Sequence, residues 1–201
     1  IDNLMEARKV LVTEMGSTLL TLAKDVKLQL EFNPAKVASY RLIGYENRLL
    51  RNEDFNDDTK DAGELGAGST VTALYEIIPG DGRQGAQDLK YQATSPARAA
   101  DSDELLTVKL RYKAPNADTS QLIARTVKDQ AQPWSRVSSD FRFAAAVANF
   151  GMQLRDSKYK GQWQFDDVIT QARSAQGKDQ ESYRHNFVIL AKQAQLLKVT
   201  D

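Results

Sequence analysis

Residues 23–50 constrain the fold of this chain most, because two strand-like runs there are separated by an Asn-Pro break. In the first run polar and apolar side chains alternate, and this period of two is typical of a half-buried strand. The apolar members are Val26, Leu28, Leu30 and Phe32. Asn33-Pro34 ends the run, because proline has no amide hydrogen to donate and moves the preceding residue out of helical geometry. A second alternating run follows around Tyr40, so we predict an antiparallel pair of strands.

A helix is predicted before this pair, over residues 4–22, because apolar residues recur there every three or four positions. Asp2 or Asn3 is a suitable N-terminal cap. Gly16 lowers the stability of such a helix by about 1 kcal/mol relative to alanine, so a break at this glycine is the alternative. The apolar side consists of Leu4, Ala7, Leu11, Met15, Leu19 and Leu22.

The middle of the chain carries further strand patterns. Residues 51–68 are polar and contain glycine, which predicts a long surface loop. Alternation of apolar and polar residues then predicts strands over residues 69–78, 106–112 and 121–127, and residues 89–92 are an optional short strand within a polar insertion. Together with the first pair, about five strands are expected to form an antiparallel, β-sandwich-like module over residues 25–132.

The last third of the sequence changes to helical spacing. Ser138 or Ser139 can cap a helix that runs to residue 155, and its apolar residues cover a wide arc. A second helix is predicted over residues 165–175, ended by Gly177, and a third over residues 179–197. The predicted fold class is therefore α+β, with an N-terminal helix, the strand module and a C-terminal module of about three helices over residues 133–201.

The charge balance and the residue types exclude several classes of protein. Lys plus Arg and Asp plus Glu number 27 each among 201 residues, so no net field attracts nucleic acid or an anionic membrane. The sequence has no cysteine, which excludes disulfides and thiolate metal sites. No apolar run reaches the roughly 18–20 residues of a membrane span, and the first residues lack the pattern of a secretory signal. Because the first residue is not Met, we expect a fragment or a processed product.

Three segments of the chain resemble a known family. They are KDVKLQLEFNPAKVASYRLIGYENRLL (residues 24–50), DAGELGAGSTVTALYEIIP (61–79) and FRFAAAVANFGMQLRDSKYKG (141–161). In this order they are similar to the carboxy-terminal region of bacterial von Willebrand factor type A domain proteins of the YfbK-like group. In that family the region follows the type A domain, and its own role is undefined. Residues 1–11 resemble the end of a type A domain, which makes residues 1–24 the remnant of its final helix.

The resemblance implies a divalent cation for the type A domain alone. Such domains bind the cation through an Asp-x-Ser-x-Ser core, whose hard oxygen ligands suit Mg²⁺. This sequence does not contain that motif, so we expect no metal ligand of this kind and no cofactor within the chain. For the whole protein, the resemblance implies metal-assisted protein binding at the bacterial cell envelope or in the periplasm.

Asp54, Asn56 and Asp58 have the alternating oxygen spacing with which a calcium-binding loop begins. The pattern then departs from such a loop. Thr59 takes the place of the glycine at the sharp turn, and Leu65 takes the place of the bidentate glutamate. A solvated acidic loop is therefore the favoured interpretation, with calcium binding as the alternative.

A basic and aromatic cluster follows the first C-terminal helix and consists of Arg155, Lys158, Tyr159, Lys160 and Trp163. Such side chains can stack on bases and attract phosphates, but cations at this place more often complement the dipole of a helix end. We therefore predict no nucleic-acid partner. The cluster is assigned to packing or to a protein-interaction surface, because Trp and Tyr are enriched in the cores of interfaces.

No set of residues in the sequence predicts catalysis. His185 is the sole histidine, which excludes a multi-histidine metal site and favours a structural role. Ser182 and Asp179 lie on the same predicted helix as His185, where they cannot present a nucleophile, a base and an orienting group to one substrate. The glycines of residues 63–68 precede a strand instead of linking a strand to a helix, which is the wrong context for a phosphate-binding loop.

The sequence therefore predicts a non-catalytic interaction module and not an enzyme. By the resemblance, the module would position a type A domain in an adhesion-like or envelope-associated complex and offer a second protein-binding surface. The alternative is a structural or regulatory subunit that acts on a partner enzyme or a metal-dependent assembly. The sequence does not specify the partner or the oligomeric state.

Overall fold

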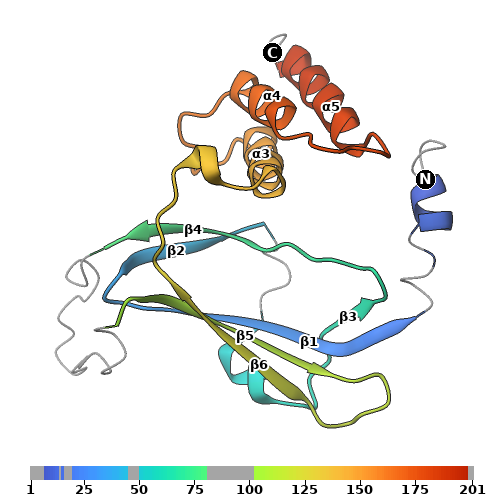
Figure 1. Ribbon diagram of the computed structural model, residues 1–201, viewed down its shortest axis with the longest axis vertical. Coiled ribbons are helices and arrows are strands. Elements are labelled where there is room, and N and C mark those ends of the chain that lie inside the picture. The colour runs from blue at the N-terminus through green and yellow to red at the C-terminus, as the bar shows by residue number, and fades with distance from the viewer. Residues whose placement is uncertain (1–6, 14, 16–19, 45–49, 81–101, 199–201) are drawn as a thin grey trace. The chain divides into compact units, whose positions relative to one another are not determined.

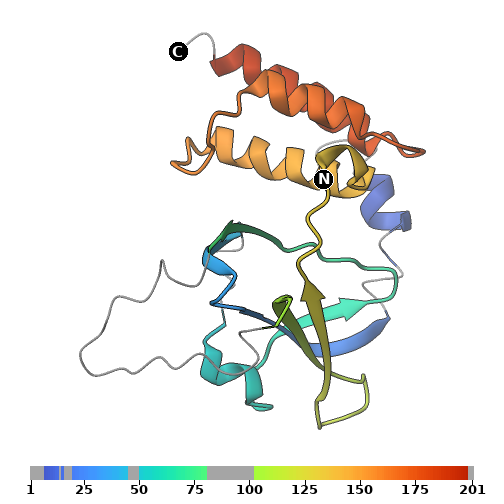
Figure 2. The same ribbon diagram turned by 60° about the vertical axis from the view of Figure 1, so that its left-hand side comes forward.

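The computed structural model describes residues 7–13, 15, 20–44, 50–80 and 102–198. The chain divides into two compact units, Ile1–Asp129 and Gln130–Asp201. Among the described residues, the first unit holds the strands and the second holds three α-helices (Figures 1 and 2). This confirms the predicted α+β class, with antiparallel sheets followed by C-terminal helices.

The described strands of the first unit form two antiparallel sheets. A four-stranded sheet has the order β3-β1-β5-β6, and a two-stranded sheet pairs β2 with β4. In both views the two-stranded sheet lies over the four-stranded one (Figures 1 and 2). The strands are β1 (Thr21–Phe32), β2 (Val37–Ile43), β3 (Gly63–Gly66), β4 (Leu74–Pro79), β5 (Glu104–Lys113) and β6 (Gln121–Lys128).

The turn at Asn33 sends the chain from one sheet to the other. The prediction that the first two strands pair was wrong, because β1 lies between β3 and β5 while β2 pairs with β4. The Asn33 side chain donates to the carbonyl of Glu104 at 2.8 Å, and its amide donates to the carbonyl of Leu105 at 2.9 Å. These bonds hold the end of β1 to β5. The ring of Phe32 then stacks on Tyr40 of β2, with centroids 4.0 Å apart.

The N-terminal helix is much shorter than predicted. It is described as a π-helical turn, η1 (Lys9–Thr13), and β1 begins at Thr21, within the predicted helix. Leu11 and Met15 of the predicted apolar side are 58% and 52% exposed. A short amphipathic segment gains most of its helical stability from burial of its apolar side, and these side chains lack that burial. Residues 4–6, 14 and 16–19 of the predicted helix lie outside the described residues.

Two elements replace parts of the surface loop predicted over residues 51–68. They are a 3-10 helix, η3 (Asn52–Asn56), and the strand β3, which begins and ends with glycines that disfavour strands. The strand predicted over residues 69–78 is shorter, because β4 begins at Leu74. The strand predicted over residues 89–92 lies outside the described residues. The predicted strands at 106–112 and 121–127 are confirmed as β5 and β6.

The four-stranded sheet has an apolar face and a polar face. Side chains at paired positions of neighbouring strands point to the same side of a sheet. The apolar face includes two such rows across β1, β5 and β6, formed by Leu28, Leu110 and Ile123 and by Phe32, Leu106 and Val127. The alternate positions form the polar face, which carries Lys27, Gln29, Glu31, Lys109 and Arg111.

The three α-helices of the second unit enclose a small apolar core. They are α3 (Ser139–Leu154), α4 (Phe165–Ser174) and α5 (Tyr183–Lys198), and a 3-10 turn, η5 (Trp134–Arg136), precedes them. Ser138 caps α3 as predicted, since its side chain accepts from the amide of Phe141 at 3.2 Å. The buried core consists of Ala146, Phe150, Phe165, Val168, Ile169, Ala172, Val188 and Ala191.

The third helix begins later than predicted, at Tyr183 instead of Asp179. Ser182 has a left-handed φ of 59°, so the chain turns before the helix starts. The carboxylate of Asp179 accepts from the amide of His185 at 2.8 Å. Asp179 therefore satisfies an amide of the first helical turn from outside the helix. Gly177 follows α4 with a φ of 60°, in agreement with its predicted role as a helix terminator.

Candidate functional site

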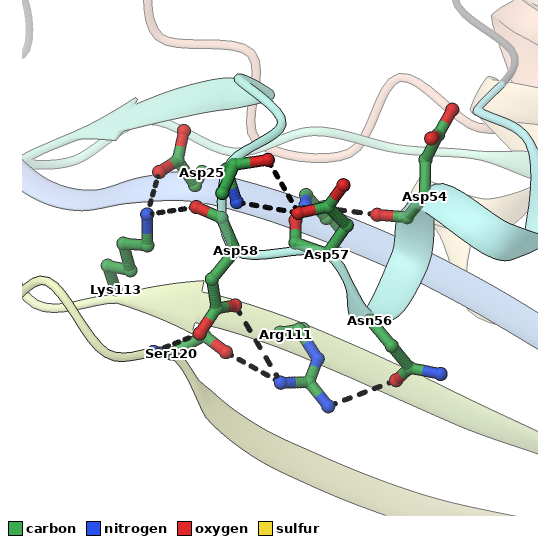
Figure 3. Close-up of polar contacts among 10 residues, drawn as sticks. Asp25, Asp54, Asn56, Asp57, Asp58, Arg111, Lys113 and Ser120 are labelled. Carbon is green, nitrogen blue, oxygen red and sulfur yellow. Dashed lines mark hydrogen bonds and ion pairs between the residues drawn. The ribbon is translucent and has the colours of Figure 1, made fainter.

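A network of polar contacts holds the acidic loop against the polar face of the four-stranded sheet (Figure 3). Two strands of the sheet supply cations and a carboxylate, and the loop supplies carbonyl, amide and carboxylate oxygens. We name this network the loop clamp. Its members are Asp25, Lys27, Asp54, Asn56, Asp57, Asp58, Arg111, Lys113 and Ser120.

Lys27 of β1 is buried within the clamp, with 3% of its surface exposed. Its ammonium group donates to the carbonyl of Asp54 at 3.1 Å and also to the carbonyl of Asp57. Burying a charged group is costly unless partners replace the water that it loses. Because both carbonyls belong to the loop, Lys27 fixes the turn between Asp54 and Asp57 to the sheet.

Lys113 of β5 joins the loop to the sheet a second time. Its ammonium group lies 2.7 Å from a carboxylate oxygen of Asp25 and donates to the carbonyl of Asp58 at 2.7 Å. The side chains of Lys113 and Asp25 are 11% and 19% exposed. The other carboxylate oxygen of Asp25 accepts from the amide of Ala62 at 3.2 Å. The pair therefore ties together β1, β5 and the connection that leads into β3.

Arg111 extends the clamp to the β5–β6 hairpin. Its guanidinium donates to the side-chain oxygen of Asn56 at 3.1 Å and to the hydroxyl of Ser120 at 2.6 Å. It also lies over the ring of buried Phe55, 5.7 Å from the centroid. The carboxylate of Asp58 accepts from the amide of Ser120 at 3.3 Å. Because Ser120 directly precedes β6, the clamp fixes the position at which that strand begins.

Asp25 lies in a β-bulge of β1. The pairing with β5 moves from Lys24 opposite Lys113 to Lys27 opposite Arg111, so β1 holds one more residue than β5 between these pairs. Asp25 has a φ of 51°, a left-handed conformation that costs a non-glycine residue about 1–2 kcal/mol. Such conformations persist where surrounding contacts determine them. The contacts of Asp25 with Lys113 and with the backbone before β3 have this effect.

The clamp favours the charged forms of Asp25, Asp58 and Lys113 through shifts of their pKa values. The hydrogen bond from Lys113 lowers the pKa of Asp25, and Asp25 in turn raises the pKa of Lys113. Hydrogen bonds from Ser120 lower the pKa of Asp58. A general acid or base works best with a pKa near the working pH, and these shifts lead away from it. The arrangement suits anchoring of the loop and not proton transfer.

We expect the first unit to lose stability below pH 3.8, the ordinary pKa of aspartate. A carboxylate whose pKa is lowered by folding stabilises the fold above its unfolded pKa, and this contribution is lost as the pH falls through the folded pKa. Replacing Asp25 with asparagine, which tolerates the left-handed φ, should lower the urea midpoint at neutral pH and flatten its acid dependence. Circular dichroism in urea across the acid range measures both effects.

An Asp129→Asn variant is the control for this measurement, because it changes an exposed carboxyl group outside the clamp. It should keep the acid dependence of the unmodified chain. An equally steep acid dependence in the Asp25→Asn variant would show that Asp25 does not contribute through its charge.

The residues considered for calcium belong to the clamp. Asp54 contributes its backbone carbonyl, which accepts from Lys27, while the carboxylate of Asp58 accepts from the amide of Ser120. The side-chain oxygen of Asn56 accepts from an arginine. Among the residues that the structure describes, no group of three or more His, Cys, Asp or Glu is arranged to hold a metal ion. Calcium binding by Asp54, Asn56 and Asp58 stays a prediction.

Sequence reasoning found the acidic loop but missed its basic partners. Lys27, Arg111 and Lys113 lie on the polar side of amphipathic strands, where such residues are ordinarily exposed. The available signal was charge complementarity between the acidic run at residues 53–58 and the cations of the strands. That signal does not identify pairs, because the loop and β5 are far apart in the sequence.

A second feature of the first unit is the sheet edge at β6. All residues of β6 are exposed, and within the described part of the chain this strand pairs with β5 alone. Leu122 points to the polar face of the sheet, and Ile123 and Val127 point to the apolar face. These side chains are 51%, 42% and 40% exposed. An edge strand offers unpaired N–H and C=O groups on which another strand can pair.

The basic and aromatic cluster lies in the connection between α3 and α4. Trp163 is partly buried and packs against the core of the helices, so its contacts are structural. Lys160 forms an ion pair with an aspartate in an i,i+4 relation. The ammonium group of Lys158 lies 4.9 Å from the ring centroid of Tyr159. Arg155 is exposed at the end of α3, and the proposed surface role of the cluster stays a prediction.

His185 is exposed on α5. The residues considered with it as catalytic groups are Ser182 and Asp179. Ser182 and Asp179 lie in the turn before the helix and not on it. Asp179 contacts the backbone amide of His185 and serves as a capping group. This geometry gives the three residues a local structural role.

Comparisons with known proteins identify the family. Residues 17–197 match the family described as "Uncharacterized protein YfbK, C-terminal". The chain belongs to the YfbK C-terminal family. It is 41% identical over 195 residues to a protein of Escherichia coli (strain K12) described as uncharacterized protein YfbK. This confirms the resemblance to the carboxy-terminal region of the YfbK-like group.

The match to YfbK covers 96% of this chain and 33% of the relative. The chain therefore spans about a third of the length of the curated relative, and it corresponds to the C-terminal part of YfbK. No solved structure gives a significant match. In the described residues of this YfbK C-terminal region, no helix has the length and apolar character needed to cross a membrane.

Proposed function

We propose that this YfbK C-terminal region is a non-catalytic module for protein interaction and positioning. The observation that supports the proposal is the exposed β6 edge with Leu122, Ile123 and Val127. Proteins usually protect a long, apolar edge strand, because it is a template for pairing. A partner strand on β6 would satisfy the free backbone groups and cover part of these side chains.

The loop clamp supports the same proposal. It holds Ser120 and thereby the start of β6, so the edge is presented in a fixed position. A pre-organised surface loses less conformational entropy when a partner binds. In the whole protein, we place this module beside a von Willebrand factor type A domain in an envelope-associated complex, and we assign any Mg²⁺ to that domain.

A photo-crosslinking amino acid at Ile123 of the full-length protein is expected to form a covalent adduct with a partner protein in cells. The reason is that Ile123 lies on the exposed β6 edge. The matched control carries the same amino acid at Lys60, an exposed position in the connection before β3. Mass spectrometry identifies both the partner and the crosslinked segment.

The outcomes of this experiment are distinct. An adduct at Ile123 with an extended segment of one protein supports the interaction role. If that protein is an enzyme or part of a metal-dependent assembly, the module belongs to a regulatory subunit that works through the same edge. Adducts of equal yield at Ile123 and Lys60, or none at either position, would count against the proposed function.

A further inference from the structure

We infer that the strand that pairs with β6 carries acidic side chains. The inference rests on the proposed interaction role and adds the chemistry of the partner. The partner segment is an extended polypeptide in which an Asp or Glu has an apolar residue two positions before it and two positions after it.

The first argument is the charge of β6 itself. The strand contains Arg125 and Lys128 and no acidic residue. Lys128 already pairs with Asp103, at 3.0 Å, so Arg125 is the charge that an incoming strand must accommodate. Opposite charges on neighbouring strands stabilise their pairing, and like charges directly opposite destabilise it. A carboxylate opposite Arg125 is therefore the favoured arrangement.

The second argument is the position of Arg125 in the sheet. Arg125 pairs with Val108 of β5, which pairs with Leu30 of β1. The arginine therefore lies in an aliphatic row of the apolar face, between the exposed residues Ile123 and Val127. The next strand out would continue this face, with apolar residues beside Ile123 and Val127 and an acid beside Arg125. These three partner residues share one face and are therefore two positions apart in the partner sequence.

The third argument separates an acidic partner from a second copy of this chain. Two β6 strands paired about a two-fold axis would bring two sets of Arg125 and Lys128 into one ladder without an acidic residue in either strand. Like charges oppose such pairing, and edge cations are a known protection against self-association. A strand with only this protective role would not also expose Leu122, Ile123 and Val127. The combination favours a different chain with acidic side chains.

The regularity of the edge fits this arrangement. The pairing of β5 with β6 runs without a shift from Leu106 opposite Val127 to Tyr112 opposite Gln121. An added strand therefore meets an unbroken ladder. The side chains of the added strand can then alternate between the two faces along the whole contact. A bulge in β6 would interrupt this alternation, because a shift of one residue moves every following side chain to the other face.

Three fluorescein-labelled peptides of equal length test the inference on the 201-residue chain. Each peptide presents valine, a test residue and valine at every second position, with threonine at the positions between them, and the test residue is glutamate, serine or lysine. In fluorescence anisotropy at low salt, the glutamate peptide should bind about fivefold more tightly than the lysine peptide, or more, because opposite charges then face Arg125. An Arg125→Glu variant should reverse this order. Arg173→Glu makes the same charge change at an exposed position of α4 and should leave the order unchanged.

Each contrary result has its own meaning. Equal binding of the glutamate and serine peptides would overturn the acidic preference but leave the interaction role of β6 intact. A preference for glutamate that persists in the Arg125→Glu variant would place binding elsewhere and also overturn the inference. If none of the peptides binds, the inference fails, and the crosslink at Ile123 decides whether the proposed function fails with it. Dimers of the unmodified chain in sedimentation that are lost on Leu122→Asp would assign the edge to a second copy.

Discussion

Replacement of Lys27 by methionine is expected to destabilise the first unit by about 2–4 kcal/mol, because it removes two hydrogen bonds from a buried charged group, each of which contributes about 1.5–3 kcal/mol. Methionine fills the space of the aliphatic stem, but the carbonyls of Asp54 and Asp57 lose the ammonium donor and keep only the backbone amides of Asp57 and Lys60. The loop should then leave the polar face of the sheet. Hydrogen-exchange mass spectrometry should show faster exchange of the amides of η3 and of Ser120.

Lys109→Met is the matched control, because Lys109 lies on the same face of the sheet and pairs with Glu31 at 2.7 Å. The Glu31 side chain is exposed, and an exposed ion pair contributes about 0–1 kcal/mol. The free energy of unfolding should therefore change little in this variant. Equal losses in the two variants would mean that burial of Lys27 does not anchor the loop.

Phe150→Ala is expected to destabilise the second unit by about 3–5 kcal/mol, the usual cost of removing a buried phenylalanine ring. Phe150 is buried, and its ring lies 6.1 Å from the ring of Phe165 and 5.3 Å from that of Phe187. The substitution opens a cavity among α3, α4 and α5. Trp163 packs against the same core, so tryptophan fluorescence in urea measures the loss as a lower unfolding midpoint.

Phe141→Ala removes the same side chain from an exposed position of the same helix. Phe141 contacts Trp134 edge-on, with centroids 6.2 Å apart, and is 48% exposed. Because about half of Phe141 stays exposed, less apolar surface leaves water on folding than at Phe150, and the loss should be about 1 kcal/mol or less. A loss in Phe141→Ala as large as that in Phe150→Ala would contradict the assignment of the core to Phe150 and its neighbours.

The elements that could be predicted from the sequence are those whose signals are local. The alternation around Val108 specified β5, and Ser138 marked the start of α3 through its capping side chain. Gly177 marked the end of α4 by its left-handed backbone. Each of these signals depends on residues close together in the chain, so each needs no knowledge of the tertiary fold.

The pairing of the strands could not be predicted in the same way. Adjacency in sequence favoured a hairpin of β1 and β2, but Asn33 uses its side chain and amide to bind residues of β5. The prediction of the N-terminal helix failed for a related reason. A short helix with one apolar side is stable only where another surface covers that side. Leu11 and Met15 of that side are largely exposed.

The candidate site was only partly visible in the sequence. The spacing of Asp54, Asn56 and Asp58 draws attention to the loop, but the sequence does not show that Lys27 and Lys113 bind its backbone carbonyls. β6 was predicted as a strand, but its place at the edge of the sheet depends on the order of strands. A half-buried central strand and an edge strand have the same alternation of residues, so periodicity alone does not separate them.

Because of the bulge at Asp25, the number of residues in β1 determines which face of the sheet each side chain at the start of the strand occupies. Lys24 and Lys27 both point to the polar face, although two strand residues on the same face are normally an even number of positions apart. If β1 kept the same number of residues without the bulge, simple alternation would place Lys24 and Lys27 on opposite faces. Lys24 would then exchange faces with the buried Ala23. The extra residue at the bulge therefore determines which side chains the beginning of the sheet buries, and deleting one residue there would remove the bulge while Lys24 stays on the polar face.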